Sequence, residues 1–365
     1  MLIGEFKLIQ QTQYTQATPK YNFPHPIDTL QIPQRLLELS LRSLKKTQDS
    51  QLLRQEYAAD EPLATNNERT FPSKVTPEKL KPNPAKTPIV AIDVSSIKLG
   101  ETQTGTLLAV RGAVVWKQTS HYNYVRLGPF PFHVTERNQD EICSLLQNPD
   151  KTLCVRENAF SNIPLVQTKL TTLLELWIRE YVNQTTHDYL TLWDGSLVAG
   201  TPETPTRAVE RLLKDARLRQ NTVLAFSKMT RMLFRGHRIT DLVLEQKSPC
   251  LLKIGGCPTV AGPLHLLGNV FVAKLSPSSC AFRLDVDKEL SYERVVDAVQ
   301  RLLGNDMVSQ SYPEALRLAH IYSTFTANEV LGIQRCVAKE SNLKIVERPN
   351  IRRLLFDRFG KGPEG

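Results

Sequence analysis

The sequence predicts an α/β protein built on one mixed sheet, with an N-terminal helical arm in front of it. Three β-rich runs come first, at 88–95, 105–117 and 121–130, and the short polar connection at 118–120 predicts that the last two are antiparallel neighbours. Helical and β-rich segments then alternate through the rest of the chain. With 365 residues, 41% of them hydrophobic, the chain is long enough for one large domain with additions.

Hydrophobic periodicity predicts the later elements. Apolar residues recur at helical spacing from Leu170 to Tyr181, which predicts a helix over 164–183. Thr204 is expected to cap a helix whose first residue is Pro205. The other predicted elements are strands at 188–194, 221–227, 267–274 and 280–285, helices at 205–219, 231–246 and 290–304, and a last long helix from Pro313.

Composition divides the chain into four segments. An N-terminal arm, 1–58, carries an amphipathic helix predicted at 33–57, which packs either on a partner subunit or on its own domain. A Pro-rich segment, 59–87, shows almost no periodicity and is expected to be a linker. The main domain is predicted over 88–335, followed by a basic C-terminal segment, 336–365.

The composition also excludes several classes of protein. No apolar run approaches the roughly 20 residues that span a bilayer, and the N-terminus lacks the basic start of a secretion signal. The six cysteines show no C-x-x-C spacing, and the closest pair, Cys250 and Cys257, has no histidine at zinc-finger spacing. We therefore expect reduced thiols in a cytoplasmic protein without a membrane segment.

Positive charge is concentrated in two parts of the chain. The formal net charge is +9, and the segment 207–238 has nine Lys or Arg residues against two acids, a net charge of +7. The segment 335–361 has eight basic residues against three acids, a net charge of +5. Such clusters favour a polyanionic partner, most often nucleic acid, although a solvated helix face has the same composition.

The order of the predicted elements is that of the ribonuclease-H-like fold, as known folds show; patterning alone indicates only α/β or α+β. In that fold the first and fourth strands are adjacent. In this sequence those two strands end on Asp93, in PIVAIDVSSI, and on Asp194, in YLTLWDGSLV, and small residues follow both. Each aspartate alone could simply cap a turn. Together they could face each other and bind Mg²⁺ or Mn²⁺, which prefer oxygen ligands.

Cleavage of a phosphodiester with two metals needs three or four convergent carboxylates or imidazoles, around ions about 3.5–4 Å apart. Glu175 flanks the buried stripe of the helix at 164–183 and is the expected third acid, with Glu157 and Glu180 as alternatives. An acid on a helix is more commonly just solvated.

Two further residues are candidates for the same site. Lys228 follows the strand at 221–227 and could bind a phosphate, or could be a solvated cation. His320 shares a helix face with Leu316, Ala319 and Ser323, where a histidine is commonly a core residue. In this fold the last helix supplies the final metal ligand or a proton shuttle, and histidine suits both roles.

Four motifs in this order resemble those of the NurA nuclease family, over residues 88–330: VAIDVSS, LTLWDGSL, LAFSKMTRM and PEALRLAHIYSTF. The resemblance implies a manganese-dependent DNA nuclease, and an oxygen-rich site would accept Mg²⁺ as well. Such an enzyme acts as a 5′-to-3′ exonuclease on single- and double-stranded DNA and as an endonuclease on single strands. The resemblance further implies a homodimer that docks on a hexameric HerA-type ATPase in DNA end processing and repair.

Carried over residue by residue, the resemblance makes Asp93, Glu175, Asp194 and His320 the metal ligands and Lys228 a phosphate contact. The basic residues Arg207, Arg211 and Arg231 are the other expected DNA contacts, with Lys214 and Arg217 on the same helix as Arg207. The chain has no Walker spacing, so an ATPase would be a separate protein.

The sequence departs from the family at two positions. Val94 stands where the family typically has glycine after the first acid, and Trp193 is bulkier than the usual residue before the second. Val94 would either crowd a metal or point away from it, because alternate strand residues face opposite sides. Val94 leaves open a second function, a non-catalytic DNA-binding or scaffold subunit. A third, a transferase or recombinase of the same fold, is not excluded by any sequence feature, although the NurA-like motifs count against it.

Overall fold

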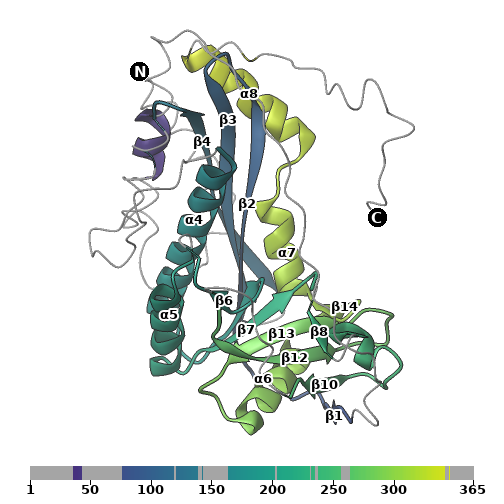
Figure 1. Cartoon of the computed structure of the whole chain (residues 1–365). Coiled ribbons are helices and arrows are strands. Elements are labelled where there is room, and N and C mark those ends of the chain that lie inside the picture. The colour runs from purple at the N-terminus through teal and green to yellow at the C-terminus, as the bar shows by residue number, and fades with distance from the viewer. Residues whose placement is uncertain are drawn as a thin grey trace.

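The computed structural model describes residues 36–42, 76–118, 121–138, 142, 163–201, 204–230, 232–234, 237–255, 264–341 and 345. A mixed sheet forms the centre of this structure (Figure 1). Its strands are β1 (Glu78–Lys79), β2 (Ile89–Glu101), β3 (Gly105–Lys117), β4 (Tyr122–Thr135), β5 (Leu190–Asp194), β7 (Thr222–Ser227), β10 (Cys250–Lys253), β12 (Gly268–Lys274) and β13 (Phe282–Asp287).

The strand order across the sheet is β1-β10-β12-β13-β7-β5-β2-β3-β4. Strands β2, β3 and β4 form an antiparallel meander, β5 pairs parallel to β2, and β7 pairs parallel to β5. This is the predicted ribonuclease-H-like order, so the predicted fold class is confirmed. Beyond β7 the sheet is extended by antiparallel pairing of β13, β12, β10 and β1.

Helices cover both faces of the sheet (Figure 1). They are α4 (Ile163–Thr185), α5 (Thr206–Leu218), the 3₁₀ helix η3 (Ile239–Val243), α6 (Tyr292–Asn305), α7 (Glu314–Ser323) and α8 (Ala327–Ser341). The structure also has three short antiparallel pairs: β6 (Val198–Ala199) with β11 (His265–Leu266), β8 (Leu233–Phe234) with β9 (His237–Arg238), and β14 (Val308–Ser309) with β15 (Tyr312–Pro313). Among these helices none has the length and apolar character needed to cross a membrane.

Side-chain alternation along β2 determines which residues meet which helices. Val90 and Ile92 are buried in one core with side chains of α4 and α5. Ile89 and Ala91 are buried in a second core, on the opposite face, with side chains of α6 and α7. Because successive strand residues point to opposite faces, Asp93 continues the second series and faces α7.

Helix α4 lies close against the meander because the facing strand has a glycine there. Leu174 and Ile178 on α4 are buried against the sheet. A Cβ added at Gly112 on β3 would come 2.5 Å from Cδ1 of Ile178. The absence of a side chain at residue 112 therefore sets how near α4, and the acid Glu175 that it carries, approaches the sheet.

The predicted helix at 231–246 is wrong. The described residues there form the short pair β8–β9 and the 3₁₀ helix η3. Ile239 and Val243 are buried against β10 and β12, with Phe234 packed beside them. The apolar spacing therefore reflects packing on the edge of the sheet, and this tertiary contact decides the local structure over the helical pattern.

The long helix predicted from Pro313 is two helices, α7 and α8. The Thr324 hydroxyl donates to the carbonyl oxygens of His320 and Ile321 and ends α7. A capping box starts α8: the Thr326 backbone N–H donates to the Glu329 carboxylate over 2.9 Å, and the Glu329 backbone N–H donates to the Thr326 hydroxyl over 3.3 Å.

One smaller expectation, the cap of α5, also changed. The N-cap of α5 is Pro205 rather than Thr204, and no side chain caps this helix. The Thr204 backbone N–H instead donates within a turn to Thr201. Of the arm helix predicted at 33–57, residues 36–42 are described; they are helical, and Leu36 and Leu39 are buried in the α4-side core of their own chain.

Truncation of Leu174 should weaken the attachment of α4 to the sheet. Leu174 is fully buried, so we expect Leu174→Ala to lower the free energy of unfolding by about 2–5 kcal/mol. The same change at Leu218, which is 73% exposed at the end of α5, should cost no more than about 0.5 kcal/mol. Urea denaturation of both variants measures the difference, and equal losses would contradict the packing described for α4.

Candidate metal centre

The sheet register brings Asp93 and Asp194 side by side. The parallel pairing of β2 with β5 runs from Ile89↔Leu190 to Ile92↔Trp193 and ends there, so the next residue on each strand is an aspartate. Strand β2 continues along β3 as far as Glu101, whereas β5 ends at Asp194. The two carboxylates therefore lie at the point where the parallel strands separate.

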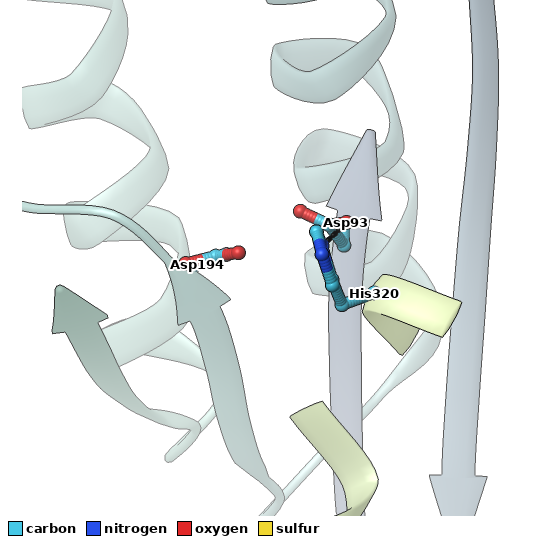
Figure 2. A group of neighbouring side chains, drawn as sticks. All are labelled: Asp93, Asp194 and His320. Atoms are coloured by element: carbon cyan, nitrogen blue, oxygen red, sulfur yellow. Dashed lines mark hydrogen bonds and ion pairs between the residues drawn. The ribbon is translucent and has the colours of Figure 1, made fainter. Parts of the chain in front are cut away.

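Helix α7 adds an imidazole to the two carboxylates. Figure 2 shows Asp93, Asp194 and His320 directed toward a common space. One ligand atom from each of the three lies within 4.8 Å of the others, the only such group found among the described residues. Nδ1 of His320 is 3.1 Å from Oδ2 of Asp93, and the His320 side chain is 46% exposed. The cluster is thus open to solvent on the histidine side.

The end of α7 fixes the Asp93 carboxylate on its buried side. The buried hydroxyl of Ser323 donates to Oδ2 of Asp93. The hydroxyl of Ser95 donates to the Ser323 carbonyl oxygen over 2.5 Å, which ties the same end of the helix to β2. Asp93 itself is only 6% exposed, so its carboxylate has little freedom to move.

A lysine occupies the other side of the cluster. Nζ of Lys228, just beyond β7, is 2.5 Å from Oδ2 of Asp194. The predicted position of Lys228, level with Asp194, follows from the parallel pairing of β5 with β7, in which Asp194 lies opposite Phe226. In this arrangement Lys228 supplies the positive charge nearest to Asp194.

Glu175 lies beside the cluster but pairs with another residue. The Arg179 guanidinium, one helical turn along α4, forms an ion pair with the Glu175 carboxylate. Cζ of Arg179 also lies 4.2 Å from the centroid of the Trp193 ring, and its Nη2 lies 3.4 Å from the Asp194 carbonyl oxygen. The structure therefore places Glu175 next to the three-residue group without bringing its carboxylate into it.

Burial and like charge act together on the acids. Burial raises the pKa of Asp93, and the charge of Asp194 raises it further; the bond from Ser323 and the charge of Lys228 oppose this without cancelling it. Burial also raises the pKa of Glu175; Arg179 opposes the shift, and the charges of Asp93 and Asp194 add to it. The two buried acids are therefore harder to ionise than ordinary carboxylic acids, even with Lys228 and Arg179 beside them.

The turn after Asp194 is fixed by the next strands of the sheet. Gly195 has a φ of +110°, a conformation that favours glycine, and its N–H donates to the Phe226 carbonyl over 2.8 Å. The Ser227 hydroxyl donates to the Gly195 carbonyl over 3.0 Å. Fully buried Asp285 accepts the Leu197 N–H over 2.9 Å. The small residue after Asp194 thus serves the turn geometry.

Val94 and Trp193, the two residues that differ from the NurA family pattern, do not obstruct the cluster. Val94 packs against the α4-side core, on the opposite face of β2 from Asp93. Trp193 is 1% exposed in the same core, away from the face of Asp194. The sequence allows Val94 either to crowd a metal or to point away from it, and in the structure Val94 points away from the cluster.

Two of the predicted DNA-contacting arginines, Arg207 and Arg211, lie on α5, away from the cluster. Helix α5 packs with α4, on the sheet face opposite to α7. Arg207 is exposed there, and Arg211 pairs with Glu180 over 3.1 Å. Arg231 and the alternative acid Glu157 lie outside the described residues. Glu180 pairs with Arg211, whereas the charges of Asp93 and Asp194 act on Glu175, so of the two described candidates Glu175 is the one beside the cluster.

Two residues of this site had no role in the sequence interpretation. Ser323 was placed on the His320 face of the helix but not assigned to Asp93. Arg179 carries an i, i+4 signal with Glu175, since acids and arginines four residues apart on a helix commonly pair. That spacing could have shown that Glu175 has a competing partner.

No protein-family model matches the sequence, and no curated protein matches it. Among solved structures, the NurA nuclease from Sulfolobus solfataricus is 16% identical, with 73% of this chain and 88% of that chain covered and a TM-score of 0.47. Endonuclease V from Bacillus subtilis is 11% identical, covering 72% and 86%, with a TM-score of 0.34. Endonuclease V from Ciona intestinalis is 14% identical, covering 70% and 92%, with a TM-score of 0.34.

Proposed function

We propose that this chain is a metal-dependent deoxyribonuclease that uses Asp93, Asp194 and His320 to hold a divalent cation. The observation that carries the proposal is the convergence of these three ligand atoms within 4.8 Å at the end of the paired strands. Ser323, His320 and Lys228 contact the two carboxylates, yet the pKa of Asp93 remains raised by burial and by the charge of Asp194, which a bound cation would offset.

The donor set fits a hard divalent cation. Carboxylate oxygens suit Mg²⁺ and Mn²⁺, and imidazole is accepted by Mn²⁺ and its neighbours among the transition metals. Ser323 and His320 both bond to Oδ2 of Asp93, which leaves Oδ1 for a cation. A cation bound there would act as a Lewis acid on a phosphoryl oxygen.

Three residues of the site would then have separate roles in the reaction. Lys228, displaced from Asp194 by the cation, would neutralise a phosphate oxygen beside it, as a point charge. His320 is half-exposed and directs Nδ1 to Asp93, so its Nε2 is available to the cation or to a proton at the leaving oxygen. Glu175 would become a further ligand if Arg179 released it.

DNA is the proposed substrate because the chain carries a net charge of +9 and its motifs resemble those of NurA nucleases. The same resemblance supports the finer proposals: Mn²⁺ as the preferred ion, 5′-to-3′ exonuclease and single-strand endonuclease activity, a homodimer, and a HerA-type ATPase partner in DNA end processing. With Val94 turned away from Asp93, the sequence feature that favoured a non-catalytic subunit no longer does so.

Asp93→Asn and Asp194→Asn should each abolish cleavage. End-labelled single- and double-stranded DNA, incubated with Mn²⁺, Mg²⁺ or EDTA, should be shortened by the wild type only when a metal is present. Each substitution removes a charged ligand, so we expect the rate to fall by at least about 100-fold.

Asp188→Asn is the matched control, because Asp188 precedes β5 at the end opposite to Asp194 and is 60% exposed. Its φ of 57° suits asparagine equally well. It should cut DNA at the wild-type rate. Salt-sensitive DNA binding without cleavage by the wild type, under any metal, would replace the nuclease by the non-catalytic subunit.

Asp93→Asn should also stabilise the metal-free protein at neutral pH. An acid whose pKa is higher in the folded than in the unfolded chain lowers stability as the pH rises through that pKa, because the folded state gives up its proton less readily. The advantage of the variant should therefore be larger at pH 7.5 than at pH 4. Urea denaturation in EDTA measures it; added Mn²⁺ should stabilise the wild type alone. A variant less stable than wild type at pH 7.5 would contradict the electrostatics described.

Lys228→Met should change metal binding and cleavage in opposite directions. Loss of the ammonium removes a positive charge that competes with the cation for Asp194, so Mn²⁺ should bind more tightly, by about tenfold or less. Cleavage should nevertheless slow, because a phosphate contact is lost. Calorimetric titration and single-turnover rates measure the two effects. Lys288→Met, an exposed lysine after β13, controls for the loss of charge and should change neither.

A further inference from the structure

Tyr312, just before α7, has a buried hydroxyl that the fold leaves unsatisfied. The residue is 8% exposed, and its hydroxyl has no hydrogen-bond partner within the described part of the chain. Buried tyrosine hydroxyls usually have a partner, and an unsatisfied one costs free energy. A phenylalanine would fill the same space without that cost, so packing alone does not explain a tyrosine here.

The aromatic ring is fixed beside the metal-binding cluster. It packs edge-on against Phe226, with centroids 6.1 Å apart, and against Phe282, with centroids 5.1 Å apart. Phe226 is the register partner of Asp194 across the β5–β7 pair. Nζ of Lys228 lies 5.9 Å from the Tyr312 ring centroid and 2.5 Å from Asp194. The ring therefore borders the same space as the two carboxylates.

The surroundings keep the hydroxyl protonated. Burial raises the pKa of Tyr312, and the charges of Asp194 and Asp93 raise it further. At neutral pH the group is therefore a hydrogen-bond donor. The charges of both carboxylates act on it, but it bonds to neither and to no other described residue, so it is free to donate to a bound ligand.

We propose that the Tyr312 hydroxyl donates a hydrogen bond to a non-bridging oxygen of the phosphate group that binds at the Asp93–Asp194–His320 cluster. This inference rests on the proposed function. A phosphodiester offers only acceptors, and it would enter between Lys228 and the cluster, on the side that the Tyr312 ring borders. Tyr312 would then contact substrate directly, whereas Ser323 acts through Asp93.

Tyr312→Phe tests the inference, with Tyr189→Phe as the matched control. The Tyr189 hydroxyl is bonded to Gln118 over 2.7 Å, and the residue lies just before β5, at the end away from Asp194. In EDTA, the melting temperature of Tyr312→Phe should equal or exceed that of the wild type, because a buried unsatisfied group is removed. A tyrosine with a structural hydrogen bond would melt lower without its hydroxyl.

Ligand binding and catalysis give the other two measurements. Inorganic phosphate, titrated in the presence of Mg²⁺, should bind Tyr312→Phe about tenfold more weakly than the wild type, as expected for a lost hydrogen bond to a charged group. The affinity of Mg²⁺ alone should be unchanged, since the hydroxyl is not a ligand. Single-turnover cleavage should slow by about tenfold or more, and Tyr189→Phe should match the wild type in both assays.

The outcomes separate the two proposals. A wild type that cleaves DNA, with a Tyr312→Phe variant that cleaves it and binds phosphate equally well, would overturn the role of Tyr312 and leave the nuclease intact. A wild type that cleaves nothing would refute the nuclease, and the phosphate titration would still decide whether Tyr312 contacts the anion. A large drop in the melting temperature of Tyr312→Phe in EDTA would also overturn the inference.

Discussion

The electrostatic repulsion between Asp93 and Asp194 is the constraint on which the rest of the site depends. Parallel pairing of β2 and β5 forces the two carboxylates into neighbouring positions, one of them almost fully buried. Burial disfavours the ionised form of Asp93, and the neighbouring charge of Asp194 adds to this effect. Ser323, His320 and Lys228 each reduce the energy of this arrangement, but the pKa of Asp93 remains raised. A divalent cation at the two carboxylates would supply the positive charge that these residues do not.

The residues around the acids are held on regular elements rather than on free loops. Asp93 and Asp194 are on strands in the centre of the sheet, and His320 and Ser323 are on α7. The end of α7 is anchored in turn: buried Arg111 on β3 donates to the Thr324 carbonyl over 3.1 Å and pairs with Glu329 of α8. Sites built on such elements keep their geometry well, which suits the positioning of a metal ion.

Much of this arrangement could be predicted from short-range features of the sequence. The placement of two aspartates on adjacent strands and a histidine on a late helix followed from the order and periodicity of the elements and their match to a known fold, although β2 runs on past Asp93 to Glu101. The break between α7 and α8 was also visible in principle, because Thr326 and Glu329 form an S/T-x-x-E box. The segment after Lys228 was not predictable in this way, since its residues are positioned by packing on β10 and β12.

Partner choice among charged residues was the least predictable part. Glu175 was expected to join the cluster, yet its carboxylate pairs with Arg179, and Arg211 pairs with Glu180 from a different helix. Such pairings depend on helix separation and rotation, which periodicity does not specify. For the same reason α5, with its basic residues, could be recognised as amphipathic, but the sheet face that it covers could not be determined.

The distance along the chain between the site's members has a consequence for the protein's synthesis. Asp93 and His320 are separated by 227 positions, and Asp93 and Ser323 by 230. During synthesis the first aspartate emerges long before the helix that completes its surroundings, and contacts of such high sequence separation form late in folding. An incomplete chain, or one cut before α7, would thus lack the assembled cluster. The topology itself thus delays completion of the Asp93–Asp194–His320 cluster until most of the chain has been made.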